Sequence, residues 1–240
     1  MTTGALNLLG VAVLAGSATQ RITGLGFALV ASPFLVLIAN PRQGVLLANM
    51  LSLITNLVVL AMVWREVNVR RALSLAVPAL LLVPVGAFVS TRVSNRALYI
   101  GIGVLVLVAL AATVASRRLH VHPGTATTVA AGAASGFMNV TAGVGGPAIT
   151  IYAVATRWEH TEFVATVQLY FALLNAGSLI AKGGLPKVGS VALLVALTAL
   201  AAGTFLGQRL NRRVPVHRAR QAVLILAVAG GVATVIKGLT

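Results

Sequence analysis

The sequence predicts an all-α protein whose helices cross a lipid bilayer several times. Three observations indicate this fold class: an extreme apolar composition, long uncharged apolar runs, and an internal repeat. Of the 240 residues, 58% are hydrophobic and only 9% are charged, and the mean hydropathy is +0.99. Soluble domains carry about a quarter charged residues, so this chain could not cover a water-facing surface. We therefore expect a polytopic transmembrane helical bundle without a soluble domain.

Six uncharged apolar runs predict the spanning helices. A stretch of about 17–25 apolar residues without charge is typical of a helix that crosses the hydrocarbon core. The runs are 45–64, 72–91, 97–116, 163–181, 188–208 and 222–236.

The internal repeat appears when the chain is shifted against itself by 119 residues. The shift aligns Gln20 with Asn139, Gly24 with Gly143, Gly26 with Gly145, Asn49 with Gln168, and Asn56 with Asn175. Random apolar sequence matches Leu, Val and Ala readily, but rarely aligns both an intramembrane amide and a Gly-x-Gly. We expect two repeats, 1–118 and 119–240, within a single integrated membrane domain.

Each repeat opens with two apolar runs that are too short to span a bilayer alone. In the first half these are 6–18 and 28–39, and in the second 125–134 and 148–156. Two interpretations remain open. Each pair forms a broken, re-entrant hairpin whose tips meet inside the membrane, or the runs belong to full helices with glycines as packing notches. Matching Gly-interrupted segments are typical of transporter binding sites, which favours the hairpin.

Loop charges give the expected topology. Basic residues gather at 65–71, 117–118 and 209–220, whereas the loops at 92–96 and 182–187 carry fewer. The positive-inside rule places the heavy loops in the cytoplasm, and this requires the second repeat to be inverted. We expect a multi-pass protein of a bacterial-type inner membrane with both termini outside the cytoplasm.

The charge balance narrows the function classes. Lys and Arg number 18 against three acidic residues. The positive-inside rule is the main expected cause, and an electrostatic preference for anions is a second one. Nucleic-acid binding is not expected, because it needs a basic face on a soluble surface. The lipid bilayer and a small anionic substrate are the expected partners, and the sequence predicts no oligomeric state.

Polar residues inside predicted membrane segments are the candidate substrate-binding residues, because such groups are costly in hydrocarbon. The alternative for each amide is a hydrogen bond that holds two helices together. Arg21 is either a deep cation that faces an anionic substrate or a side chain that snorkels to the headgroups. The candidates are Gln20, Arg21, Thr23, Gly24, Gly26, Asn49, Asn56, Asn139, Thr141, Gly143, Gly145, Gly146, Gln168 and Asn175.

The glycines at the two breaks favour an anion site. Glycine lets the backbone approach a ligand closely. Where a helix begins inside the membrane, its free N–H groups and its dipole attract negative charge. Two such helix starts that face each other would bind an oxyanion without a cluster of cations.

Catalysis, metal binding and cofactors are not expected. The chain has no Cys and no Asp, its three Glu lie at segment ends, and its four His lie in loops. No carboxylate or His is therefore available to relay protons through the spans. We predict no catalytic residues, no metal site and no cofactor.

Short glycine-rich motifs at the two breaks and near the end of the chain carry a family resemblance. The segments are Gly24-Leu25-Gly26-Phe27-Ala28 with Pro33, Gly132-Ala133-Ala134-Ser135-Gly136, Gly143-Val144-Gly145-Gly146-Pro147, and 203–210. Over nearly the whole chain they resemble the sulfite exporter TauE/SafE family of membrane permeases. The family often has a longer glycine run at the first break and an Asp after the next span, where this chain has Phe27 and Asn68.

The resemblance implies transport of a small sulfur-containing anion, such as sulfite, a sulfonate like sulfoacetate, or a related organic acid. The residues themselves indicate an anion site and do not select sulfur. We expect an alternating-access transporter. An anion channel and a non-transporting structural membrane subunit are the alternatives.

Overall fold

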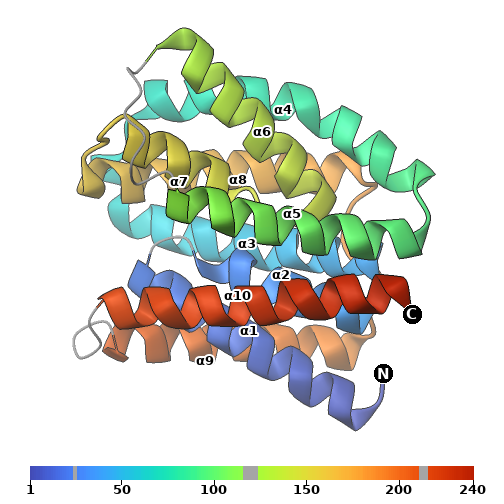
Figure 1. The fold of residues 1–240 in the computed structure, drawn as a ribbon. Helices are drawn as coiled ribbons and strands as arrows, with labels where there is room; N and C mark the ends of the chain where they lie inside the picture. Colours follow the sequence, from blue (N-terminus) through green and yellow to red (C-terminus); the bar gives the residue numbers. More distant parts are fainter. Residues whose placement is uncertain (24–25, 116–123, 211–215) are drawn as a thin grey trace.

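The computed structural model describes residues 1–23, 26–115, 124–210 and 216–240, with the side chains of residues 21–23, 26, 216, 217 and 220 outside the description. The described part is built of helices and short turns (Figure 1), which confirms the all-α fold class. The helices are α1 (Thr3–Thr23), α2 (Gly26–Ala39), α3 (Pro41–Val63), the 3-10 turn η1 (Trp64–Glu66), α4 (Val69–Arg92), α5 (Asn95–Ala115), α6 (Thr125–Ala142), α7 (Gly146–Ala155), α8 (His160–Ala181), α9 (Ser190–Leu210) and α10 (Val216–Leu239).

Six of these helices are long and apolar enough to cross a membrane, as predicted. They are α3, α4, α5, α8, α9 and α10. Helix α2 has 14 residues and α7 has 10, so they are about 21 Å and 15 Å long. Neither covers a hydrocarbon core of about 30 Å. The prediction of six spans is therefore confirmed, and the second helix of each predicted hairpin is short, as expected.

The first helix of each hairpin is longer than its apolar run predicted. Helix α1 has 21 residues and α6 has 18, so both continue through polar positions at which we expected a break. The reason is that hydroxyl side chains there bond to carbonyls of their own helix. Thr19 Oγ1 donates to Ala15 O over 2.8 Å, and Thr141 Oγ1 donates to Phe137 O over 2.6 Å. Hydroxyls satisfied in this way do not interrupt the helix.

The two hairpins enter the bundle from opposite ends. Figure 1 shows that α1 begins and α2 ends where both chain termini lie, whereas α6 begins and α7 ends at the other end. They meet through Ser32 of α2, whose Oγ donates to Ala142 O at the last residue of α6 over 2.6 Å. The end of α6 is thus held from the first hairpin.

Helices at equivalent places in the two halves lie antiparallel. The start of α5 bonds to the end of α10, because Arg96 Nε donates to Gly238 O over 2.9 Å. The start of α3 meets the turn after α8, because Lys187 N donates to Gln43 Oε1 over 2.6 Å. Helices α4 and α6 also pack together, and so do α1 and α9.

Small residues allow these helices to approach closely. A Cβ at Gly136 of α6 would lie 2.7 Å from Ala79 Cα in α4. A Cβ at Gly203 of α9 would likewise lie against Leu14 of α1. Because lipid is as apolar as Leu, such close backbone packing is a main source of helix association in membranes.

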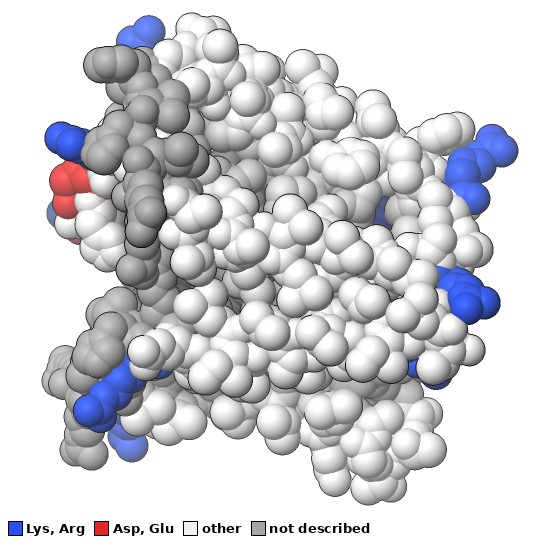
Figure 2. Space-filling model, in the orientation of Figure 1, with Lys and Arg blue, Asp and Glu red and all other residues white. Residues whose placement is uncertain are grey.

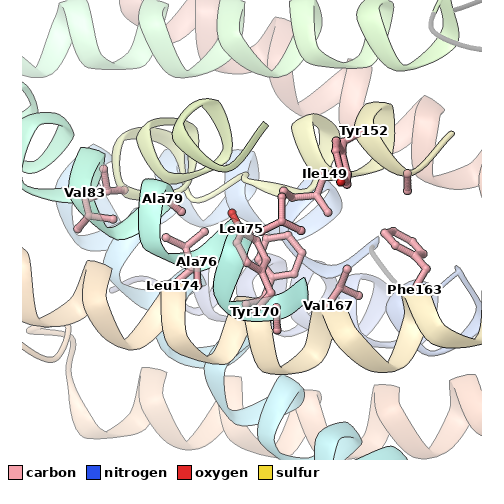
Figure 3. Close-up of a cluster of buried hydrophobic side chains, with 14 of the residues drawn as sticks. Leu75, Ala76, Ala79, Val83, Ile149, Tyr152, Phe163, Val167, Tyr170 and Leu174 are labelled. Atoms are coloured by element: carbon pink, nitrogen blue, oxygen red, sulfur yellow. The ribbon is translucent and has the colours of Figure 1, made fainter. Parts of the chain in front are cut away.

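Helices α3 and α8 form the centre of the bundle. Within their apolar windows, 61% and 67% of residues are buried, against 33% for α5, α9 and α10, which therefore face lipid. Figure 3 shows the apolar packing around α8, where Tyr170 and Leu174 face Leu75 of α4 and Ile149 of α7. The outer helices surround this pair.

Among the residues that the structure describes, charged side chains lie at the two ends of the bundle and leave an uncharged belt between them (Figure 2). We call the end at which both chain termini lie the terminal end, and the opposite end the Trp158 end. The terminal end carries Arg42, Arg92, Arg96, Lys182, Lys187 and Lys237, and the Trp158 end carries Arg65, Glu66, Arg70, Arg71, Arg157, Glu159 and Glu162. A belt without charge between two charged rims is the surface that a bilayer requires. The molecule is a multi-pass membrane protein.

Candidate substrate-binding site

A small buried cavity lies where both hairpins meet the central helices. Its volume is about 30 Å³, which is room for one or two water molecules. Its lining is Gln20, Ala28, Ser52, Asn56, Asn139, Gly145, Gly146, Phe171 and Asn175. Both halves of the chain contribute, and seven of the nine lining residues are polar or glycine.

Two repeat-related hydrogen bonds frame the cavity. In the first half, Gln20 Nε2 of α1 donates to Asn56 Oδ1 of α3 over 3.3 Å. In the second half, Asn139 Nδ2 of α6 donates to Asn175 Oδ1 of α8 over 3.1 Å. The 119-residue shift aligned these two pairs in the sequence, and the structure brings all four residues to one cavity. They are between 2% and 8% exposed.

The second pair has an additional bond. Asn139 Nδ2 also donates to Ser178 Oγ over 3.1 Å. In both pairs the Asn on the spanning helix uses its oxygen as an acceptor. The amino groups of Asn56 and Asn175 donate no hydrogen bond within the described residues, and each is therefore available to a ligand in the cavity.

The break between α6 and α7 forms the glycine wall of the cavity. Gly143 ends α6 in the left-handed conformation, with φ 71°, and its N–H donates to Asn139 O over 2.8 Å. Ser135 Oγ then fixes the turn by donating to Gly145 O over 2.8 Å. A Cβ at Gly145 would lie 2.7 Å from Ser135 Oγ, so the turn accepts only glycine there.

Helix α7 begins at the cavity. Gly146 is its first residue and Pro147 its second. The N–H groups of the first helical turn have no partner in their own helix, and the helix dipole makes this end positive. Proline is well suited to the first turn because it has no N–H to satisfy. Gly145 and Gly146 line the cavity, so the positive end of α7 lies beside it and favours an anion there.

Several buried polar atoms of the central helices α3 and α8 have no partner within the described residues. These are Asn49 Nδ2, Asn49 Oδ1, Ser52 Oγ and Gln168 Oε1. Leaving such an atom unpaired costs about 1–3 kcal/mol. Ser52 lines the cavity and is 7% exposed, so its hydroxyl is free to bind whatever occupies the cavity.

The structure brings together six of the predicted residues and leaves others apart. Gln20, Asn56, Asn139, Asn175, Gly145 and Gly146 line the cavity. Asn49 and Gln168 are buried two helical turns from Asn56 and Asn175 and do not line it. Thr141 bonds within α6, and Gly143 shapes the turn. The structure does not describe Gly24, nor the side-chain surroundings of Arg21, Thr23 and Gly26.

Three lining residues were not among the candidate substrate-binding residues, and two of them had a signal in the sequence. Ser52 stands one helical turn before Asn56, and the 119-residue shift carries Ser52 to Phe171. Extending the repeat to this position would have identified both. Ala28 gave no such signal, because an apolar residue in an apolar helix is not distinctive.

Asn68 has a structural role in the turn between α3 and α4. Its Oδ1 accepts from Arg71 N over 3.0 Å and so caps α4, and its Nδ2 donates to Glu162 Oε1 over 2.9 Å. The turn is thereby tied to the start of α8. Among the described residues, no group of three or more His, Asp or Glu is placed to hold a metal ion.

A comparison with protein-family models gives a match that covers nearly the whole chain. The model of the sulfite exporter TauE/SafE family matches residues 8–234. The chain belongs to the TauE/SafE family. The resemblance that the glycine motifs carried is confirmed, and the TauE/SafE assignment makes this protein a member of a family of membrane sulfite exporters. The searches of curated proteins and of solved structures gave no match.

Proposed function

We propose that this protein carries a small oxyanion, sulfite or a small sulfonate, across the membrane through the central cavity. The observation that carries the proposal is the cavity itself. Amide groups from both halves and the first turn of α7 surround it, and no described lining side chain is charged. Hydrogen-bond donors held at fixed positions in a dry site bind an anion strongly without a large charge cluster.

The available donors match the shape of sulfite. The ion has three oxygens around one sulfur, and each oxygen accepts hydrogen bonds. The amino groups of Asn56 and Asn175, the hydroxyl of Ser52 and the N–H groups of α7 approach the cavity from different helices. Typical ligand pockets measure about 300–1,000 Å³. The much smaller volume here supports a substrate of few atoms.

Arg21 adds a cation in this proposal. It follows Gln20, whose amide lines the cavity. An Arg at that depth would pair with the anionic head, which is one of the two roles that the sequence leaves open for Arg21.

Alternating access is the mechanism that the architecture supports. The hairpins enter from opposite ends, and helices in equivalent places lie antiparallel. This is the arrangement expected if repeats 1–118 and 119–240 have inverted topology and are related by a pseudo-two-fold axis in the membrane plane. Rocking of one half against the other would open the cavity first to one side and then to the other. In the present structure the cavity is closed to a narrow volume.

The charge distribution supports an orientation. The positive-inside rule places the Trp158 end, with the heavily basic loops of the sequence, in the cytoplasm. The chain termini then lie outside, in a bacterial-type inner membrane. We propose transport without enzymatic activity and without a cofactor.

The first test is substrate-induced stabilisation of the detergent-purified protein. We expect sulfite to raise the melting temperature in a saturable way in the wild type, and matched carboxylates to raise it less. The Asn175→Ala variant should lose this shift, because it removes a free donor of the cavity. Asn7→Ala is the matched control, since Asn7 is exposed on α1. Arg21→Ala tests the predicted cation in the same assay.

Two alternatives give other results. A structural membrane subunit shows no shift with any small anion. An anion channel shows flux in proteoliposomes that does not saturate and does not exchange labelled substrate. A shift that survives in Asn175→Ala would place the anion elsewhere and overturn the assignment of the cavity.

A further inference from the structure

A lysine near the cavity holds the end of α6 without any carboxylate to balance its charge. Lys182 directly follows α8, and its Nζ donates to Val140 O over 2.9 Å. Val140 is the residue after Asn139, whose amide lines the cavity. The lysine therefore bonds to the residue that directly follows a candidate substrate-binding residue.

A row of polar groups on α8 leads from the cavity to this lysine. Asn175 lines the cavity, Ser178 accepts from Asn139, and Lys182 follows at the terminal end. Residues three and four apart share one face of a helix, so these three groups form one stripe. The stripe places one polar group at each turn of α8 between the cavity and the terminal end.

The charges around Lys182 are all positive. The chain has no Asp, and its three Glu lie at the Trp158 end. Arg42 of α3 faces Lys182, and the Arg42 guanidinium donates to Ser90 O, Thr91 O and Val93 O at the end of α4. Helices α2 and α6 carry no ionisable side chain near this point, and Arg92 and Lys187 are the other cations of this end.

This environment disfavours a bound proton on the lysine. Burial, and then the Arg42 charge, lower the Lys182 pKa from its ordinary value of 10.5 to about 8. A half-buried ammonium normally has an anionic partner, because removal from water is costly. Here a single carbonyl takes one of its three N–H donors. The other donors are available to a mobile anion.

We propose that Lys182 is a second anion-binding group, which holds the substrate at the mouth of the route between the cavity and the terminal end. The oxyanion replaces the Val140 carbonyl as the acceptor of the Lys182 ammonium. It then moves past Ser178 to Asn175 and into the cavity, or leaves in the reverse order. The inference rests on the proposed function. A lysine that only caps α6 gives a different result, because a cap affects stability and leaves substrate affinity unchanged.

The test is uptake of sulfur-35-labelled sulfite by proteoliposomes, with KM and kcat measured separately. At pH 7 we expect Lys182→Gln to raise KM about tenfold, the loss typical of one hydrogen bond to a charged group, with kcat changed less than about twofold. Lys187→Gln is the control, because Lys187 is an exposed cation of the same end. It should change KM less than about twofold.

The pH dependence gives a second readout. The ratio of the Lys182→Gln KM to the wild-type KM should fall toward one as the pH rises through about 8, because the wild type then loses its own ammonium. The titration of sulfite cancels in this ratio. Lys182→Arg keeps a cation at all these pH values, so its KM should lack the wild-type rise above pH 8. If Lys182→Gln does not fold, the pH dependence of KM in Lys182→Arg still tests the proposal.

The outcomes separate the two proposals. If the wild type takes up no sulfite in a saturable way, the proposed transport function fails. If the wild type and Asn175→Ala behave as expected but Lys182→Gln keeps the wild-type KM and only melts earlier, Lys182 is a cap and this inference alone is overturned.

Discussion

Removing the cavity amides one at a time should affect the two halves unequally. Asn139 makes two side-chain bonds of 3.1 Å, to Asn175 and Ser178, whereas Gln20 makes one of 3.3 Å, to Asn56. Such bonds between membrane helices average about 0.6 kcal/mol, with a maximum near 1.7. We therefore expect Asn139→Ala to lower the free energy of unfolding by about 1.2 kcal/mol, and Gln20→Ala by about 0.6. The first value corresponds to about sevenfold in the equilibrium constant.

The assay is reversible unfolding in mixed detergent micelles, followed by far-UV circular dichroism. A double-mutant cycle of Asn139→Ala with Asn175→Ala isolates their interaction, for which we expect about 0.6 kcal/mol. The exposed Asn7→Ala variant should change stability by less than about 0.5 kcal/mol. A Gln20→Ala variant at least as destabilised as Asn139→Ala would refute the reasoning, and so would a coupling energy near zero.

Three further predictions concern charge and packing. Lys182→Met should raise the melting temperature at pH 7, with a net gain of roughly 1–2 kcal/mol, because the folded-state pKa of about 8 lies below 10.5. The unfolded chain then binds the proton more tightly, so wild-type stability rises with pH from about 8 to about 10.5 and the advantage of the variant shrinks over that window. Gly136→Val should prevent stable folding, because its side chain would force α6 away from the α4 backbone, and size-exclusion chromatography should show loss of the monodisperse protein. Gly101→Ala is the control and should elute like the wild type, because a Cβ at Gly101 meets no atom within 4 Å. Arg71→Lys should cost about 0.5–1 kcal/mol in thermal melts, because the Arg71 guanidinium lies 3.7 Å from the Trp158 ring centroid.

The repeat was the most informative signal in the sequence. Apolar runs alone predict how many helices span, but they do not say which polar residues meet. The 119-residue shift paired Gln20 with Asn139 and Asn56 with Asn175, and the structure joins the members of each half by a hydrogen bond. Polar residues are rare enough in this chain that their recurrence reports a shared three-dimensional role.

Helix ends and detailed packing were less accessible from the sequence. Helix α6 continues to Ala142 because Thr141 satisfies its hydroxyl within the helix and Ser32 and Lys182 satisfy carbonyls at its end. These partners lie far away in the chain, and no local pattern announces them. Asn49 is buried but does not line the cavity. Asn49 and Asn56 share one face of α3, and only the packing of α3 against α8 decides which of them reaches the cavity.

The two halves differ at the positions that matter most for the substrate. Phe27 occupies the place in the first half that Gly146 holds in the second, and it is 1% exposed. Phe171 occupies the place in the second half that Ser52 holds in the first, and both line the cavity. An aromatic side chain therefore stands opposite a glycine in one pair and opposite a hydroxyl donor in the other. We therefore expect an asymmetric set of donors, on α3, on α8 and at the start of α7, to hold the proposed anion in one orientation, although the surrounding helices follow the repeat.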